Sequence, residues 1–178
     1  MANTKFEEFV KTQKARQQNA RTFDPAARLV DWKSKVEQLY TTVQDFLKSH
    51  ISDGDITPKF DNIEVTEELL GSYTIRRLSL KIGAQTVVLK PVAAMVIGSS
   101  GRVDLQGSAG SVKLVLVEKD ARERRLTITV SAERALESHA SLPVAELVWK
   151  IATPPPTMRL IELTQDSLMD TIVEVSNG

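Results

Sequence analysis

SYTIRRLSLKIG, at residues 72–83, is the first of five β-rich runs that decide the fold of this chain. The other four are QTVVLKPVAAMVIG at 85–98, SSGRVDLQGSAG at 99–110, SVKLVLVEKD at 111–120 and ERRLTITVS at 123–131. Glycine, serine or charged residues separate the runs at the distances that hairpins require. The pattern predicts an antiparallel meander that extends from Gly71 to Val130.

Two interruptions of the apolar pattern predict where this sheet curves. In the first run the apolar positions change from odd-numbered to even-numbered residues across Arg76 and Arg77, which indicates a β-bulge or a bend. Pro91 interrupts the second run, so this run is either an edge strand or two short pieces that meet at a bend. The run that begins at Ser111 is apolar on both faces, which predicts a central strand.

A long amphipathic helix precedes the meander. Asp24 is a favourable N-cap residue, and Pro25 suits the first helical position. Apolar residues then recur at alternating spacings of three and four, and the helix is expected to end between Ser49 and Asp53. The apolar stripe consists of Leu29, Trp32, Val36, Leu39, Val43 and Phe46, and it is widened by Val30, Tyr40 and Leu47. This width favours packing against the sheet over a coiled-coil dimer.

The remaining segments complete an α+β chain. Residues 52–68 form an acidic connection, with a first strand opening near Ile63. Strands are predicted at 146–152 and 158–163, on either side of three consecutive prolines. A short helix follows Thr164 and carries Leu168, Ile172 and Val175 on one stripe.

The predicted fold is therefore α+β, with a curved and mostly antiparallel sheet of about six to eight strands. A long N-terminal helix and a short C-terminal helix pack on this sheet. Residues 1–22 are expected to be a basic and partly helical arm, because lysine and arginine outnumber glutamate there. Residues 23–178 are expected to form a single domain.

Composition restricts the classes of function. The chain has no cysteine, so disulfides, zinc–thiolate sites and cysteine nucleophiles are excluded. Its 23 basic and 23 acidic residues cancel, which argues against nucleic acid as the main partner. No stretch is apolar enough for a secretory signal or a membrane span, so the expected location is the cytoplasm, without a membrane contact.

The motifs that carry chemistry are incomplete. The glycine–serine turns at 98–101 and 107–110 lack the lysine and the following helix of a nucleotide loop, so hairpin turns explain them better. Asp104, Glu118 and Lys119 have the residue types of a nuclease site, but Glu118 and Lys119 are consecutive and point to opposite faces. The sequence therefore predicts no cofactor and no metal, and it favours a protein that is not an enzyme.

The sequence favours an interaction module that binds a protein partner, or a second copy of itself, through the helix at 25–50 or through a sheet edge. The candidate interface is the helix stripe Leu29, Trp32, Val36, Leu39, Val43 and Phe46. The alternative is a small-ligand-binding or hydrolytic domain that uses the concave face of the sheet. The candidate residues for that pocket are Arg77, Lys90, Arg102 and Asp104.

Overall fold

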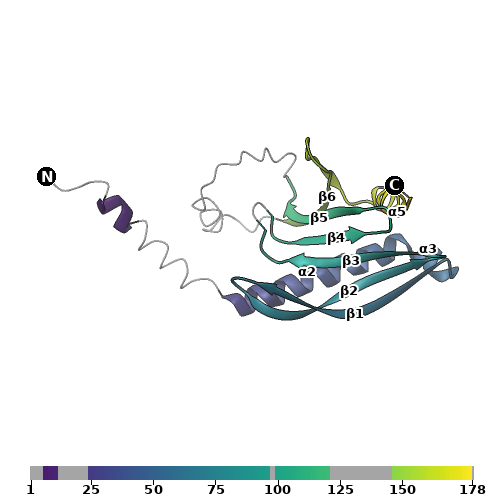
Figure 1. The fold of residues 1–178 in the computed structure, drawn as a ribbon, viewed down its shortest axis with the longest axis horizontal. Coiled ribbons are helices and arrows are strands. Elements are labelled where there is room, and N and C mark those ends of the chain that lie inside the picture. The colour runs from purple at the N-terminus through teal and green to yellow at the C-terminus, as the bar shows by residue number, and fades with distance from the viewer. Residues whose placement is uncertain (1–5, 12–23, 97–98, 121–145, 178) are drawn as a thin grey trace.

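The computed structural model describes residues 6–11, 24–96, 99–120 and 146–177 (Figure 1). Its elements are α2 (Pro25–Phe46), α3 (Lys48–Ser52), β1 (Ile56–Glu67), β2 (Gly71–Ile82), β3 (Gln85–Ala93), β4 (Arg102–Gln106), β5 (Ser111–Glu118), β6 (Leu147–Ala152), β7 (Leu160–Glu162) and α5 (Gln165–Asn177). Residues 6–11 are also helical. The strand predicted at 126–130 and the rest of the basic arm lie outside the described residues.

The described strands form one seven-stranded sheet in the order β1-β2-β3-β4-β5-β6-β7. Every neighbouring pair is antiparallel, so the predicted meander and the α+β class are confirmed. The meander begins earlier than the pattern indicated, because β1 contributes 12 residues from the acidic connection.

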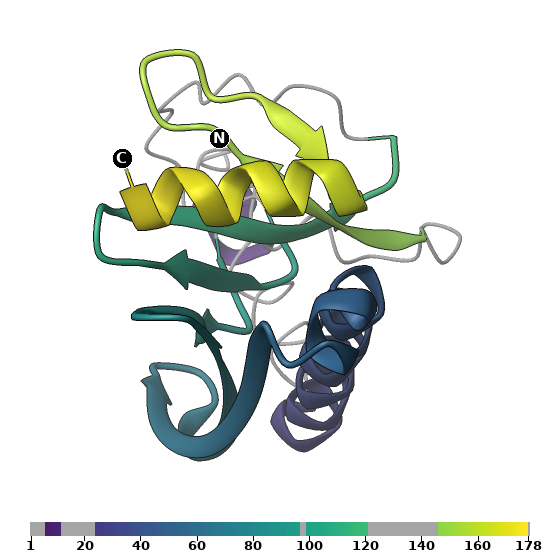
Figure 2. The ribbon, with the colours of Figure 1, turned by 90° about the vertical axis from the view of Figure 1, so that its right-hand side faces the viewer.

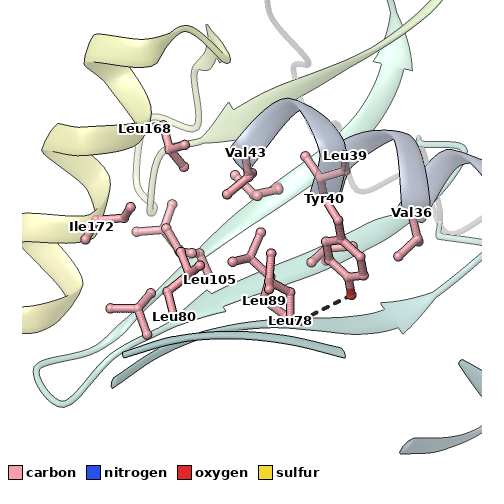
Figure 3. Close-up of a cluster of buried hydrophobic side chains, with 14 of the residues drawn as sticks. Val36, Leu39, Tyr40, Val43, Leu78, Leu80, Leu89, Leu105, Leu168 and Ile172 are labelled. Carbon is pink, nitrogen blue, oxygen red and sulfur yellow. Dashed lines mark hydrogen bonds between the residues drawn. The ribbon is translucent and has the colours of Figure 1, made fainter. Parts of the chain in front are cut away.

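Both long helices pack on the same side of the sheet. Figure 2 shows α2 in the hollow formed by the curled hairpin of β1 and β2, with α5 lying across the later strands. The core between helices and sheet includes fully buried Leu39, Leu78, Leu89, Leu105 and Leu168 (Figure 3). Each such leucine stabilises the fold by about 2 kcal/mol relative to an exposed one.

The start of α2 agrees with the sequence prediction. The Asp24 side chain accepts hydrogen bonds from the N–H groups of Ala26 and Ala27, at 3.0 and 3.1 Å. The predicted helix is divided near its end, because α2 stops at Phe46 and α3 begins after Leu47. The predicted short C-terminal helix is also confirmed, with Leu168, Ile172 and Val175 buried.

The hairpin of β1 and β2 bends without a bulge. Its pairing runs without a shift from Ile56–Ile82 to Glu67–Gly71, so neither strand contains an extra residue. Both strands nevertheless change the face that they bury at the same level, at Phe60–Asp61 in β1 and at Arg77–Leu78 in β2. A bulge at Arg76–Arg77 is therefore wrong and a bend is right, since a two-stranded ribbon twists strongly as a unit (Figure 1).

Pro91 lies in a central strand, so its interpretation as a mark of an edge strand is wrong. β3 pairs with β2 on one side and with β4 on the other, and its register shifts between Pro91 and Ala93. Pairing with β2 ends at Leu89, before the proline is reached. The missing N–H therefore costs no hydrogen bond to β2, and the alternative of a bend is correct.

Candidate functional site

The candidate interface on α2 lies inside the protein. Trp32, Val36, Leu39 and Val43 are fully buried, and Leu29 and Phe46 are partly buried against the same core. By contrast, Val30 is 69% exposed and does not belong to the packed stripe. The seam therefore packs on the sheet, and a partner could reach it only by displacing the helix.

The four candidate pocket residues lie on the side of the sheet that faces away from the helices, which we call the outer face. Arg77 comes from β2, Lys90 from β3, and Arg102 and Asp104 from β4. The residues that alternate with them, Leu78, Leu89, Val103 and Leu105, are fully buried in the core. Because side chains along a strand point alternately to the two faces, Lys90, Arg102 and Asp104 point away from the helices. Arg77 lies at the bend, between Leu78 of the core and Arg76, which bonds to Glu37 of α2, so it too is directed away from them.

Two arginine–carboxylate pairs organise the outer face. The Arg102 Nε and Nη2 atoms donate to the two carboxylate oxygens of Asp104, at 2.7 and 2.8 Å. Arg77 likewise donates through Nε and Nη2 to the two carboxylate oxygens of Asp61 on β1. Such bidentate pairs are stronger and more directional than single contacts. Three of the four candidates are thus already engaged in ion pairs.

Lys90 differs from the other three candidates. It is exposed and stands directly opposite Asp104 in the register of β3 and β4. Lys113 of β5, also exposed, stands opposite Asp104 on the other side. The structure therefore brings Lys90, Arg102 and Asp104 together and adds Lys113, which the sequence did not single out.

The hollow side of the sheet is filled by side chains. Tyr40 of α2 is buried there, and its hydroxyl lies 2.8 Å from the carbonyl oxygen of Arg76 and 3.4 Å from that of Leu89 (Figure 3). Burial raises the pKa of Tyr40 far above its usual value. On β6, Trp149 Nε1 donates to the carbonyl oxygen of Lys35 at 3.3 Å, which ties α2 to the far end of the sheet. The polar atoms on this side thus hold the helix in place.

Glu67, the last residue of β1, holds the tip of the hairpin against the segment after β3. Its carboxylate accepts the N–H groups of Ala94 and Met95, at 2.9 and 3.2 Å, and the hydroxyl of Tyr73. Burial, and then the neighbouring carboxylate, raise the pKa of Tyr73 above the usual range. The carboxylate and its three donors thus form hydrogen bonds with one another. Glu67 therefore has a structural role that the sequence did not reveal.

The free edge of β1 is the longest unpaired backbone surface among the described strands. β1 stands at one end of the strand order and pairs only with β2 (Figure 1). Pro58 pairs with Leu80 in register but has no N–H to donate. Ile82 and Gln85 flank a two-residue turn and are therefore a hydrogen-bonded pair, so the odd-numbered residues of β2 direct their backbone groups to β1. Their partners in β1 are also odd-numbered, and the even-numbered residues of β1 point their N–H and C=O groups away from β2. These residues are Phe60, Asn62, Glu64 and Thr66.

Features of catalytic chemistry are sparse in the described part of the chain. No group of three or more histidine, aspartate or glutamate side chains there is arranged to hold a metal ion. Lys119, considered above for a nuclease site, instead forms an ion pair with Glu146 at 3.0 Å. Among the same residues, no helix combines the length and the apolarity needed to cross a membrane.

One shallow hollow lies beside Lys113, at the end of the sheet where β5 begins and β6 ends. It is lined by Ser111, Val112, Lys113, Ala152, Thr153, Pro154, Pro155 and Met158.

Comparison of the chain with protein families, with curated proteins and with solved structures finds no match.

Proposed function

We propose that the protein is a non-enzymatic interaction module whose β1 edge pairs with the same edge of a second copy. The observation that supports this proposal is the unpaired, outward-directed backbone of β1 from Phe60 to Thr66. A strand added to such an edge gains main-chain hydrogen bonds, and antiparallel pairing of identical edges gives a closed twofold dimer.

The side chains of β1 favour one register for this pairing. With the twofold axis at Ile63, the two Ile63 side chains meet, and Asn62 of each copy faces Glu64 of the other. Lys59 and Glu67 then form the last pair at both ends of the ladder, while the Glu67 carboxylate stays bound to the N–H groups of Ala94 and Met95. Pro58 remains just outside the paired segment, where its missing N–H costs nothing.

Neighbouring registers are less favourable. An axis at Asp61 or at Glu64 would place two identical carboxylates directly opposite each other, which destabilises a strand pair. An axis at Asn62 would bring Pro58 into the ladder opposite Thr66, with one hydrogen bond missing at each end.

The packing of the helices weighs against the alternative of a ligand-binding or hydrolytic site on the concave face. That side is occupied by Leu39, Tyr40 and Val43 of α2, all of which are buried. The charged residues Arg77 and Asp104, which such a site would use, point to the outer face and are already bound to Asp61 and Arg102.

Proline substitutions at the free edge test the proposal. Asn62→Pro removes an N–H that does not bond to β2, and its ring blocks an incoming strand. Asn62→Ala keeps the N–H and is the matched control, and Thr66→Pro is a second blocking variant. We expect light scattering to show a dimer for the wild type and for Asn62→Ala, and a monomer for both proline variants. Circular dichroism should show that all four proteins are folded.

Two results would overturn the proposal. The first is a wild-type protein that remains monomeric at the highest concentration at which it stays in solution. The second is a dimer that persists in both folded proline variants, which would place the contact on another surface.

A further inference from the structure

The fold sorts the charges of a neutral chain onto different faces. Four lysines of the outer face, one each from β1, β2, β3 and β5, are exposed, and we call them the lysine patch. The patch consists of Lys59, Lys81, Lys90 and Lys113. The exposed acids of α5, Asp166, Asp170 and Glu174, belong to a helix that packs on the opposite side of the sheet. The outer face therefore carries exposed positive charge although the net charge of the chain is zero.

The acids near the lysine patch are already bound to arginine. Asp61 is held by Arg77, and Asp104 is held by Arg102. The ion pairs of the described residues therefore leave the four lysines without a carboxylate partner. A surface with positive potential and free ammonium donors is complementary to carboxylates.

The lysines share the outer face with uncharged polar side chains, with Val88, and with the two arginine–carboxylate pairs, of which Asp104 lies between Lys90 and Lys113. The uncharged polar residues are Thr57, Ser79, Thr86, Gln106 and Ser111, which alternate with core residues on β1 to β5. Hydroxyl and amide groups add hydrogen-bond donors for carboxylate oxygens without adding repulsion. Lys90 and Lys113 lie two strands apart, about 10 Å. This spacing matches acidic residues three positions apart in an extended polyproline II segment, where they point to the same side at about 9 Å.

An apolar contact lies next to this patch. The apolar residues that line the hollow beside Lys113 include Ala152, Pro154, Pro155 and Met158. A partner that places a carboxylate on Lys113 could bury a neighbouring apolar side chain in this hollow. The combination of ammonium groups and an apolar hollow suits a polypeptide better than a nucleic acid, because the patch offers no aromatic ring for base stacking.

We propose that the lysine patch is a binding site for an acidic, extended segment of another protein. The site lies on the outer face, and of its four lysines only Lys59 also takes part in the proposed pairing of β1 edges. It can therefore be tested in the Asn62→Pro background, where the proposed self-association is blocked.

A glutamate-rich synthetic peptide with one leucine, labelled for fluorescence anisotropy, is the probe. We expect it to bind the folded protein with an affinity that falls as salt is raised, since exposed charges are screened. Lys90→Gln combined with Lys113→Gln should weaken binding about tenfold, because two charge contacts are lost. Lys48→Gln, at an exposed lysine on α3, is the matched control and should leave the affinity unchanged.

Four outcomes would overturn the proposal. The peptide could fail to bind, or the double variant could bind as tightly as the wild type while unfolding at the same temperature. The same peptide with glutamine in place of glutamate could also bind equally well. A single-stranded oligonucleotide that binds more tightly than the peptide, and loses affinity in the double variant, would reassign the patch to nucleic acid.

Discussion

Asp61 and Arg77 face each other across β1 and β2 at the level where both strands exchange the face that they turn toward the core. Their bidentate ion pair therefore occupies the bend of the hairpin. Each side chain remains about one-third exposed, at 35% for Asp61 and 34% for Arg77. Solvent screening limits the contribution of such a pair to the stability of the fold. The pair nevertheless joins β1 to β2 at the bend of the hairpin.

Loss of this pair should have a modest effect on stability. We expect Asp61→Asn to lower the free energy of unfolding by about 1 kcal/mol, because Arg77 loses a charged partner. Asp170→Asn, at an exposed position on α5, is the control and should change the value by less than about 0.5 kcal/mol. Urea unfolding at neutral pH measures both; equal effects would show that the pair adds nothing beyond a surface charge.

The free energy of unfolding should also decrease as the pH rises into the alkaline range. Tyr40 and Tyr73 have pKa values raised above the ordinary value of 10.0, chiefly by burial, so the folded state favours their neutral form. The unfolded chain releases these protons first as the pH passes about 10. The stabilisation is therefore complete below that pH and declines above it. Urea unfolding across this range should show the decline, and Tyr40→Phe combined with Tyr73→Phe should reduce its slope; an unchanged slope would contradict the assignment.

Gly107 and Gly110 lie in the same hairpin turn but should respond differently to alanine. A Cβ atom on Gly107 would overlap the carbonyl oxygen of Val175 at the end of α5, whereas nothing lies within 4 Å of one on Gly110. We expect Gly107→Ala to lower the unfolding free energy by about 1–3 kcal/mol. Gly110→Ala, the matched control, should change it by less than about 0.5 kcal/mol. Similar losses in both variants would exclude steric contact with α5 as the cause.

Leu39 lies on the buried side of α2, and Val30 lies on its exposed side. We expect Leu39→Ala to destabilise the protein by about 2–5 kcal/mol, since it leaves a cavity in the core. Val30 is 69% exposed, so Val30→Ala should be nearly neutral. Thermal unfolding of the two variants measures the difference. A small loss for Leu39→Ala would instead support the seam as an external interface.

Much of the fold could be predicted because its signals are local. Asp24 and Pro25 mark the start of α2 by capping chemistry that needs no tertiary contact. The glycine-containing turns between β2 and β5 likewise indicate hairpin connections from only a few residues. Pro91 was ambiguous for a different reason. Whether a strand is central depends on its neighbours, and a proline is tolerated there only because pairing with β2 ends at Leu89.

The candidate surfaces could be predicted only in part. β1 was largely missed because its side chains are at most partly buried beyond Ile56, so their alternation is weak in the sequence. The pairing of Asp61 with Arg77 requires the register of the hairpin, which no residue type reveals. The position of Lys113 near Lys90 could not be predicted either, because it also depends on strand register. The two lysines lie on β3 and β5, which both pair with β4, and each stands opposite Asp104.

The agreement between strand order and chain order affects how the protein can fold. Each described strand pairs with the described strand that precedes it, and from β1 to β5 the chain closes only short connections. α5 follows all seven strands and contacts β3, β4 and β5. Until this helix docks, apolar residues of the central strands stay uncovered. Protection from proteases and from aggregation should therefore arrive last, with the docking of Leu168 and Ile172.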